Sequence, residues 1–329
     1  MLAPTEDGGM ASLPSVSDSH CSIISTYEEN AVSRTAEVLG DDGMVALPTE
    51  TVYGLGASIS SERAIQRVFA TKGRPTSHPL IVHLADFDQI DQYSSGVSTE
   101  ARSCAEACWP GPFTMLVRRS NSIPDAVVGG SEFVALRVPA NSFTRRVITE
   151  LGQPIAAPSA NKFGKVSPTS AQHVCDDLGD LVDLIVDDGP CSIGVESTIV
   201  DFTSERPRLV RPGGLPAEDI ERVLGYSLDR SASEIRAPGT LPVHYQPRAS
   251  VRVLDDGEDL DVVVKGLRNS GKLVVTLKHV ETPPILASTL YAQLREADLL
   301  GADVVVARLP RPMGLGLAVR DRLNRAATR

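Results

Sequence analysis

The segment ATKGRPTSHPLIVHLADF, residues 70–87, carries Lys72, Arg74, His78 and His83 in a chain whose formal net charge is −10. In an extended stretch, Lys72 and Arg74 would share a face, so both cations could meet one polyanion. His83 lies two positions after Ile81 in the predicted strand PLIVHL, so these two should share a face as well. A solvated helix end and a structural strand histidine explain the residues singly. Together they favour an anion site.

Hydroxyl-rich segments border several other predicted strands. They are PTETVYGLGA (48–57), APSANKFGKVSPTSAQHV (157–174), GVESTIVD (194–201) and LVRPGG (209–214). Ligand sites of α/β sheets form at strand ends, and hydroxyl, amide and backbone N–H groups at helix starts suit phosphate or ribose. Each segment alone could be an ordinary turn or capping loop. As a set they predict a basic, hydroxyl-rich cleft for an anion or a nucleotide.

Motifs of other enzyme classes are missing. The chain has no GxxxxGK[ST] loop, no GxSxG elbow and no HExxH helix. GLGLAV at 314–319 half-matches a dinucleotide motif, but a tight strand-to-helix turn explains it. These motifs contain no nucleophilic side chain paired with a general base. This fits catalysis that positions a polyphosphate and neutralises its charge.

The composition of the chain excludes further classes of protein. The chain has 329 residues, 42% of them hydrophobic, and its net charge of −10 disfavours broad nucleic-acid binding. No apolar run approaches the roughly 20 residues of a membrane span, and no signal peptide pattern is present. We therefore expect a cytoplasmic protein that does not bind membranes. Five scattered cysteines predict reduced thiols, with neither a disulfide framework nor a metal site.

Helices and strands alternate along most of the chain. We expect an unstructured lead-in (1–26), a first domain (27–224), a linker (225–250) and a smaller domain (251–329). The first domain should be an α/β fold with a twisted, mostly buried mixed sheet, because several predicted strands follow one another directly. The second reads as a βαβαβα unit with a Rossmann-like pattern.

The motifs resemble a known family. PTETVYGLGA, KGRPTSHPLIVHL, WPGPFTMLV, ALRVP, APSANKFGKVSPTSAQHV, GVESTIVD and RPG occur in the order and approximate spacing of YrdC-domain proteins, the threonylcarbamoyl-AMP synthases. The linker APGTLPVHYQP and the small domain resemble the long form of that family. The resemblance covers residues from about 30 to the C-terminus, and it implies a YrdC-like fold for the first domain.

The resemblance implies an activity and a set of site residues. The activity is the condensation of L-threonine, bicarbonate and ATP, with Mg²⁺ accompanying ATP, to L-threonylcarbamoyladenylate and pyrophosphate. Carried onto this sequence, it implies catalytic roles for Lys72 and Arg74. It places Thr51, His83, Arg137, Ala157 and Ser197 around threonine, and Arg74, His78, Phe133, Ser159, Ser167, Arg211 and Tyr245 around ATP.

The resemblance also implies partners. The product would pass to a transferase complex that modifies the adenosine next to the anticodon of certain tRNAs, and direct binding of tRNA by this chain is left open. A competing reading is an RNA-binding or ribosome-maturation module that uses the cationic cleft. The small domain alone could also serve regulation or interaction.

Overall fold

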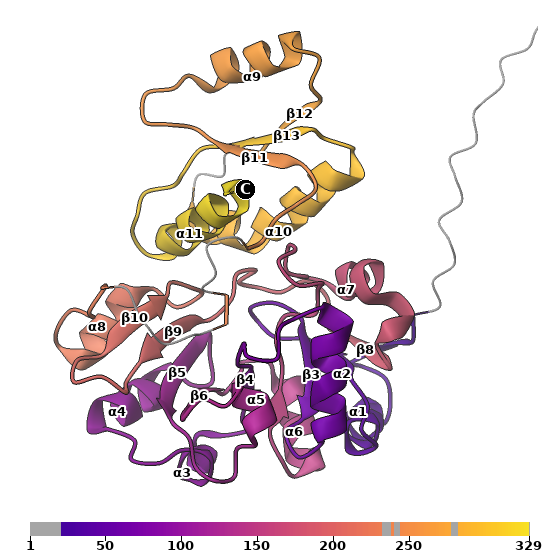
Figure 1. Ribbon diagram of the computed structural model, residues 1–329, viewed down its shortest axis with the longest axis vertical. Coiled ribbons are helices and arrows are strands. Elements are labelled where there is room, and N and C mark those ends of the chain that lie inside the picture. Colours follow the sequence, from indigo (N-terminus) through magenta and orange to yellow (C-terminus); the bar gives the residue numbers. More distant parts are fainter. Residues whose placement is uncertain (1–20, 232–237, 240–243, 278–281, 329) are drawn as a thin grey trace, which may run out of the picture.

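The described residues form two α/β units. The computed structural model describes residues 21–231, 238–239, 244–277 and 282–328. In these ranges the chain forms a ten-stranded sheet and a separate three-stranded sheet, and the smaller unit lies against one end of the larger (Figure 1). The predicted fold class, a mixed sheet with helices followed by a smaller α/β unit, is confirmed.

The larger unit follows the predicted alternation. Its elements are β1 (Ile23–Ser25), α1 (Ala31–Gly40), β2 (Val45–Leu47), β3 (Gly54–Ser58), α2 (Glu62–Lys72), β4 (Ile81–His83), a 3₁₀ turn (Phe87–Gln89), α3 (Ile90–Tyr93), α4 (Thr99–Cys108), β5 (Phe113–Arg118), α5 (Asp125–Val128), β6 (Phe133–Arg137), α6 (Ser142–Leu151), β7 (Ile155–Ala156), α7 (Ala171–Leu178), a 3₁₀ turn (Gly179–Leu181), β8 (Leu184–Asp187), β9 (Thr198–Asp201), β10 (Arg208–Arg211) and α8 (Ala217–Leu224). The strand order is β1-β8-β2-β3-β7-β4-β6-β5-β9-β10. The sheet contains both parallel pairs, such as β4 with β6, and antiparallel pairs, such as β3 with β7, so it is mixed.

Both faces of the large sheet are buried. On β2, Ala46 joins a core with residues of α2, α4, α7 and α8, whereas Val45 and Leu47 join a second core with residues of α1 and α6. This split follows from the two-residue period of a strand. On the second face, the small cluster of Ile81, Leu116 and Ala135 on β4, β5 and β6 contains no helical residue. Within the described residues, no helix therefore joins this cluster on β4, β5 and β6.

The helix that leads to β4 corrects one expectation. Ser61 caps α2 as predicted, with its Oγ accepting a hydrogen bond from the Ala64 N–H at 3.0 Å. Lys72 is the last residue of this helix, and Gly73 follows with a φ of 63°. The left-handed glycine turns the chain. Lys72 and Arg74 are therefore not alternate residues of one extended stretch.

The smaller unit is a parallel three-layer arrangement. Its elements are β11 (Ser250–Val253), α9 (Leu260–Asn269), β12 (Val274–Thr276), α10 (Pro283–Leu299), β13 (Val304–Ala307) and α11 (Leu315–Ala327), and its strand order is β11-β13-β12. GLGLAV forms the turn into α11 and the start of that helix. Helices α10 and α11 face the larger unit, and α9 lies on the far side of the sheet (Figure 1).

Apolar residues of both units share one core at this junction. Val52, Val166 and Val195 of the larger unit cluster with residues of α10 and α11, such as Leu290 and Val319. Shared burial of apolar surface stabilises the contact between the two units. Within the expected linker (225–250), Leu228 is buried in the core of the larger unit and Ser250 is the first residue of β11. Residues 232–237 and 240–243 of it lie outside the described residues.

The expected lead-in and the expected free thiols need correction. Residues 1–20 lie outside the described residues, but Ile23–Ser25 form the edge strand β1, which pairs in parallel with β8. Three residues suffice for an edge strand, and the buried side chain of Ile24 anchors it. Cys21 forms a disulfide with Cys175 of α7, whose Cα atoms are 5.9 Å apart. A sequence separation of 154 residues gave no local signal for this pair. Cys104, Cys108 and Cys191 are free.

No helix within the described ranges combines the length and the apolar character needed to cross a membrane.

Gly194 tests how tightly the two units pack. Its φ is +74°, and an added Cβ would lie 2.6 Å from the Ser288 Cα on α10. Gly189 has the same φ of +74° but open space around its Cβ position. We expect Gly189→Ala to lower the free energy of unfolding by roughly 1–2 kcal/mol and Gly194→Ala to lower it by about 1–3 kcal/mol more.

Urea denaturation of the two glycine variants and the unchanged protein measures this difference. Equal losses in both variants would show that the two units do not pack closely at Gly194.

Candidate functional site

A small pocket lies over the part of the large sheet that no helix covers. Its floor comes from Ile81 and His83 on β4, Arg137 on β6 and Ala157 after β7. The parallel pairing of β4 with β6 sets His83 directly beside Arg137. The full lining is Thr49, Thr51, Val52, Gly54, Arg74, Ile81, His83, Arg137, Ala157, Pro158, Ser159, Glu196, Ser197, Arg211, Pro238, Gly239, His244 and Tyr245.

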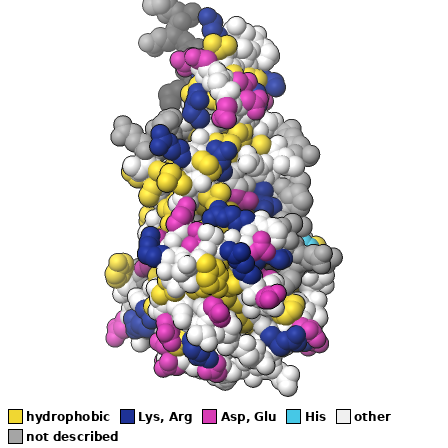
Figure 2. Space-filling view, turned by 90° about the vertical axis from the view of Figure 1, so that its left-hand side faces the viewer, with side chains coloured by type: hydrophobic (Ala, Val, Ile, Leu, Met, Phe, Trp, Pro, Cys, Tyr) yellow, Lys and Arg dark blue, Asp and Glu magenta, His cyan; other side chains and the backbone are white. Residues whose placement is uncertain are grey.

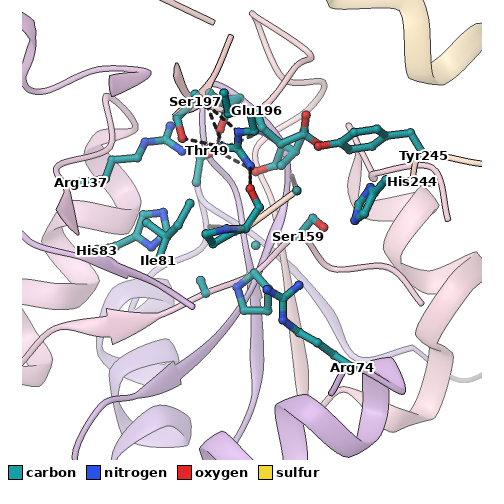
Figure 3. Close-up of a pocket in the computed structure, with 18 residues that line it drawn as sticks. Thr49, Arg74, Ile81, His83, Arg137, Ser159, Glu196, Ser197, His244 and Tyr245 are labelled. Carbon is teal, nitrogen blue, oxygen red and sulfur yellow. Dashed lines mark hydrogen bonds between the residues drawn. The ribbon is translucent and has the colours of Figure 1, made fainter. Parts of the chain in front are cut away.

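The pocket has two opposed walls (Figure 3). His83 and Arg137 lie on one side and His244 and Tyr245 on the other, with Ser159 between them (Figure 3). The cavity that remains measures about 50 Å³.

Arg74 and Arg211 give the pocket an excess of positive charge. Both are buried, at 8% and 2% exposure, and both bind neutral carbonyl oxygens. Arg74 donates to the Pro79 oxygen at 2.9 Å, and Arg211 donates to the oxygens of Ser197 and Pro238, each at 2.8 Å. In the ranges that the structure describes, neither forms an ion pair with a carboxylate.

Burial and the charge of Arg211 lower the pKa of Arg74 to about 10. Arg74 therefore stays protonated at neutral pH. Two buried cations without a counter-ion create a strong local attraction for an anion.

Arg137 already has a partner. Its guanidinium donates to Glu50 Oε1 at 2.6 Å, and both side chains are at most 8% exposed. Glu50 Oε2 accepts from the Ala140 N–H at 3.0 Å, and the Arg137 Nε donates to the Gly111 oxygen at 3.2 Å. The pair fixes the Arg137 side chain at the pocket wall.

His83 is neutral in this environment. Burial, reinforced by the neighbouring charge of Arg137, lowers the pKa of His83 to about 3. Its Nδ1 is buried and has no hydrogen-bond partner within the described residues. A buried polar atom without a partner is uncommon and suits a site that awaits a ligand.

Glu196, which also lines the pocket, is a fully engaged carboxylate. Ser167 donates to its Oε1 at 2.6 Å, Arg322 to its Oε2 at 2.8 Å and Tyr291 to its Oε2 at 2.8 Å. Burial opposes the charge of Glu196, but Arg322, Arg211 and these hydrogen bonds outweigh it and lower the pKa to about 2. Glu196 is thus ionised and has no capacity left to act as a base.

The wall formed by His244 and Tyr245 belongs to the segment between the two units. Their rings contact each other with centroids 4.0 Å apart, and His244 also contacts Phe163 at 6.2 Å. Burial lowers the pKa of His244 to about 3 and raises that of Tyr245 to about 12, so both are neutral at pH 7. The His244 Nδ1 and the Tyr245 hydroxyl have no partner within the described residues.

Most of the predicted site residues meet in this pocket. Those that line it are Thr51, Arg74, His83, Arg137, Ala157, Ser159, Ser197, Arg211 and Tyr245. His83 and Ile81 share the pocket face, as the strand period predicted. The Ala157 N–H is used within the protein, donating to the Ile81 oxygen at 2.9 Å.

Two predicted site residues, Lys72 and Ser167, are buried and do not line the pocket. The Lys72 ammonium is 3% exposed, and it donates to the backbone oxygens of Ser159 and Asn161. It does not line the pocket, and it binds the loop that presents Ser159, so its catalytic role stays a prediction. Ser167 is fully buried and its hydroxyl is bound to Glu196, so it supports a pocket residue and does not line the pocket.

His78 and Phe133 lie beside the pocket without lining it. The His78 ring contacts Phe163 edge-on at 5.7 Å, and the Arg74 guanidinium lies 5.8 Å from the same ring. Phe133 packs against the Ile81 cluster on the pocket face. Their proximity to ATP stays a prediction.

Several residues at the site had not been assigned from the sequence. Glu196 lies in the motif GVESTIVD and Thr49 in PTETVYGLGA, so their signal in the sequence is membership of these motifs. Phe163, which contacts Arg74, His78 and His244, lies in the loop segment 157–174. Tyr291 and Arg322 reach Glu196 from a different unit, and no local pattern marks them.

Comparison with known proteins adds family information. A family described as "Telomere recombination" matches residues 37–213, and one described as "Threonylcarbamoyl-AMP synthase, C-terminal domain" matches residues 215–328. The chain is 38% identical to the threonylcarbamoyl-AMP synthase of Pyrococcus abyssi, over 91% of this chain and 95% of that protein. For the Bacillus subtilis protein of the same name, identity is 35% over 90% and 92%.

Shorter relatives and solved structures agree. A putative threonylcarbamoyl-AMP synthase of Mycobacterium tuberculosis is 34% identical and aligns with 55% of this chain and 83% of its own length. The crystal structure of P. abyssi Sua5 complexed with L-threonine superposes with a TM-score of 0.87 at 37% identity, over 93% of this chain and 97% of that chain.

The neutral state of His83 predicts a pH dependence of stability. Its pKa falls from an ordinary 6.5 to about 3 on folding. Between these values the unfolded chain binds a proton that the folded chain does not, so stability falls as the pH drops through this window. We expect His83→Asn to make the loss shallower by up to about 1.4 kcal/mol per pH unit.

Urea unfolding from pH 7.5 to pH 4.5 measures this slope, and His78→Asn, at a partly exposed position, controls for loss of an imidazole. An unchanged slope in His83→Asn would contradict the assignment of a neutral His83.

Proposed function

This chain belongs to the threonylcarbamoyl-AMP synthase family, which are enzymes of tRNA modification, and we propose that the pocket over β4 and β6 is where L-threonine, bicarbonate and ATP react. The observation that carries the proposal is the pair of buried arginines, Arg74 and Arg211, whose only hydrogen-bond partners within the described residues are uncharged oxygen atoms. A triphosphate supplies the negative charge that these cations lack.

Threonine would occupy the opposite side of the pocket. His83 and Arg137 form that wall, and the hydroxyls of Thr49 and Thr51 lie 2.8 Å apart at its edge. The P. abyssi relative was solved with L-threonine, which supports an amino acid site in this fold. We place the threonine carboxylate at Arg137, because a guanidinium can bind two carboxylates when its several N–H groups point in different directions.

The reaction requires the protein to orient the reactants and to neutralise the charge of the phosphates. The threonine amine bonds to the carbon of bicarbonate, and the leaving hydroxide departs as water with a proton from the amine. A carbamate oxygen then bonds to the α-phosphorus as the bond to the bridging oxygen breaks, releasing pyrophosphate. Neither step needs a covalent enzyme intermediate. Arg74 and Arg211 would stabilise the charge that develops on the phosphates, and the neutral imidazole of His83 can accept a hydrogen bond from the amine.

The segment that carries His244 and Tyr245 would act as a lid. Pro238, Gly239, His244 and Tyr245 line the pocket together with Arg74 and Arg211, and the cavity that they leave is small, about 50 Å³. This segment would withdraw to admit ATP. Closure afterwards would keep water from a labile carbamate.

We infer that Mg²⁺ enters with ATP and has no cage of its own. Within the described ranges, no group of three or more His, Cys, Asp or Glu side chains is placed to hold a metal ion. The nearby carboxylates, Glu50 and Glu196, are already engaged by arginines. The protein residues therefore do not fit a metal cage, and we assign no step to the ion.

Transfer of the product to a tRNA-modifying complex is part of the same proposal. The competing reading, an RNA-binding module, finds less support, since basic and acidic side chains are interspersed over the face shown in Figure 2. The cations of the pocket are also buried, which suits a small ligand better than a polymer.

The role of Arg74 can be tested by removing its charge. We expect Arg74→Ala to lower kcat/KM for ATP by about 10²-fold or more, because a cation aimed at the phosphates is lost. Formation of L-threonylcarbamoyl-AMP at varied ATP concentrations measures this. Arg67→Ala is the matched control, since Arg67 pairs with Asp183 on the surface at 2.9 Å. Near-normal kinetics for Arg74→Ala would refute the ATP site.

The role of Arg137 needs a variant pair, because Glu50 depends on it. Arg137→Met alone leaves a buried carboxylate unpaired, which typically costs about 3–5 kcal/mol. Arg137→Met with Glu50→Gln removes both charges. We expect the double variant to fold and to raise KM for threonine by about 10–100-fold, the loss of a charged hydrogen bond, with KM for ATP unchanged. If KM for threonine were also unchanged, Arg137 would not bind the substrate.

A further inference from the structure

Two residues of the smaller unit reach the walls of the pocket. Tyr291 on α10 and Arg322 on α11 are both fully buried, and both contact Glu196 and Tyr245. We infer that Tyr291 and Arg322 are positioning residues for the reaction: they hold Tyr245 and Glu196 in place and so keep the lid closed. The inference rests on the proposed function of the pocket, and it extends that function to the second unit.

Arg322 joins three segments of the pocket at once. Its Nε donates to Glu196 Oε2 at 2.8 Å, and its Nη1 donates to the Pro212 oxygen at 2.9 Å. Its guanidinium carbon lies 5.0 Å from the centroid of the Tyr245 ring, within the range of a cation–π contact. Glu196 precedes Ser197 and Pro212 follows Arg211, so Arg322 fixes the neighbours of two pocket residues.

Tyr291 completes the arrangement. Its hydroxyl donates to Glu196 Oε2 at 2.8 Å, and its ring stacks on the Tyr245 ring with centroids 5.7 Å apart and planes inclined by 23°. The Tyr245 ring therefore contacts two side chains of the smaller unit. The Tyr245 hydroxyl forms no hydrogen bond with a described residue, so no such bond holds the ring from the pocket side.

Tyr245 needs such support because of its backbone. Its φ is +62°, a left-handed conformation that a bulky residue rarely adopts. Such a residue persists only where its surroundings hold it in place. Gly239 is fitted closely against it, since a Cβ there would lie 2.6 Å from the Tyr245 hydroxyl and 2.8 Å from Arg211 Nη1. Loss of the contacts with Tyr291 and Arg322 would release the strained residue from the pocket.

Another contact between the units provides a matched control. Arg295 on α10 forms an ion pair with Asp177 at 2.6 Å and is 13% exposed. Within the described residues, Arg295 contacts neither Tyr245 nor Glu196. Arg295→Met removes a half-buried arginine from the same junction and leaves the lid contacts intact.

Hydrogen exchange of the full-length protein without substrates tests the lid directly. We expect Arg322→Met and Tyr291→Leu to raise amide exchange at residues 244–249 by about tenfold or more, with exchange in β11 and β13 unchanged. Arg295→Met should leave residues 244–249 at the unchanged rate. Tyr291→Leu removes the ring that stacks on Tyr245 and leaves the ion pair of Arg322 with Glu196 in place, so it remains informative if Arg322→Met does not fold.

A second readout follows the reaction. We expect the two lid variants to release more pyrophosphate per L-threonylcarbamoyl-AMP formed, because water reaches the α-phosphorus. This ratio does not depend on the folded fraction, and Arg295→Met should keep the ratio of the unchanged protein. Arg322→Met with Glu196→Gln removes both charges, and it should recover thermal stability while the ratio stays high.

The outcomes separate the two proposals. Unchanged exchange and an unchanged ratio in both lid variants would overturn the positioning role, as would equal changes in Arg295→Met. If the unchanged protein formed no L-threonylcarbamoyl-AMP, the proposed function of the pocket would fail instead, whatever the exchange data showed.

Discussion

The carboxylate of Glu196 is the group on which the arrangement of the two units depends. It is buried, it is ionised, and it receives hydrogen bonds from Ser167, Tyr291 and Arg322. A charge in such a place is stable only when every lone pair has a donor and a counter-ion lies close by. Here the counter-ion comes from the other unit. The junction between the units and the wall of the pocket therefore share one electrostatic requirement.

The same requirement explains why the pocket is basic in an acidic protein. The net charge of −10 is spread over the whole chain, whereas the carboxylates nearest the pocket are each neutralised by an arginine of their own. Arg74 and Arg211 are left with uncharged partners. Local pairing, rather than overall composition, decides the sign of the potential at a buried site. An acidic surface and a site for a polyanion are thus compatible.

The sequence predicted those parts of the site that depend on short-range periodicity. The two-residue period of a strand placed Ile81 and His83 on one face, and a serine before an apolar helical stripe marked the start of α2. It failed where a side chain finds its partner far along the chain. Lys72 binds backbone oxygens some 90 positions away. Arg322 meets Glu196 across 126 positions, and no local pattern records such a meeting.

The dependence of Glu196 on Arg322 also limits how this protein can be divided during evolution. The M. tuberculosis relative aligns with only about half of this chain. If a shorter chain of this type retained a carboxylate where Glu196 stands, it would need a different cation beside it or a site open to water. Loss or gain of the second unit would then require a compensating change in the first.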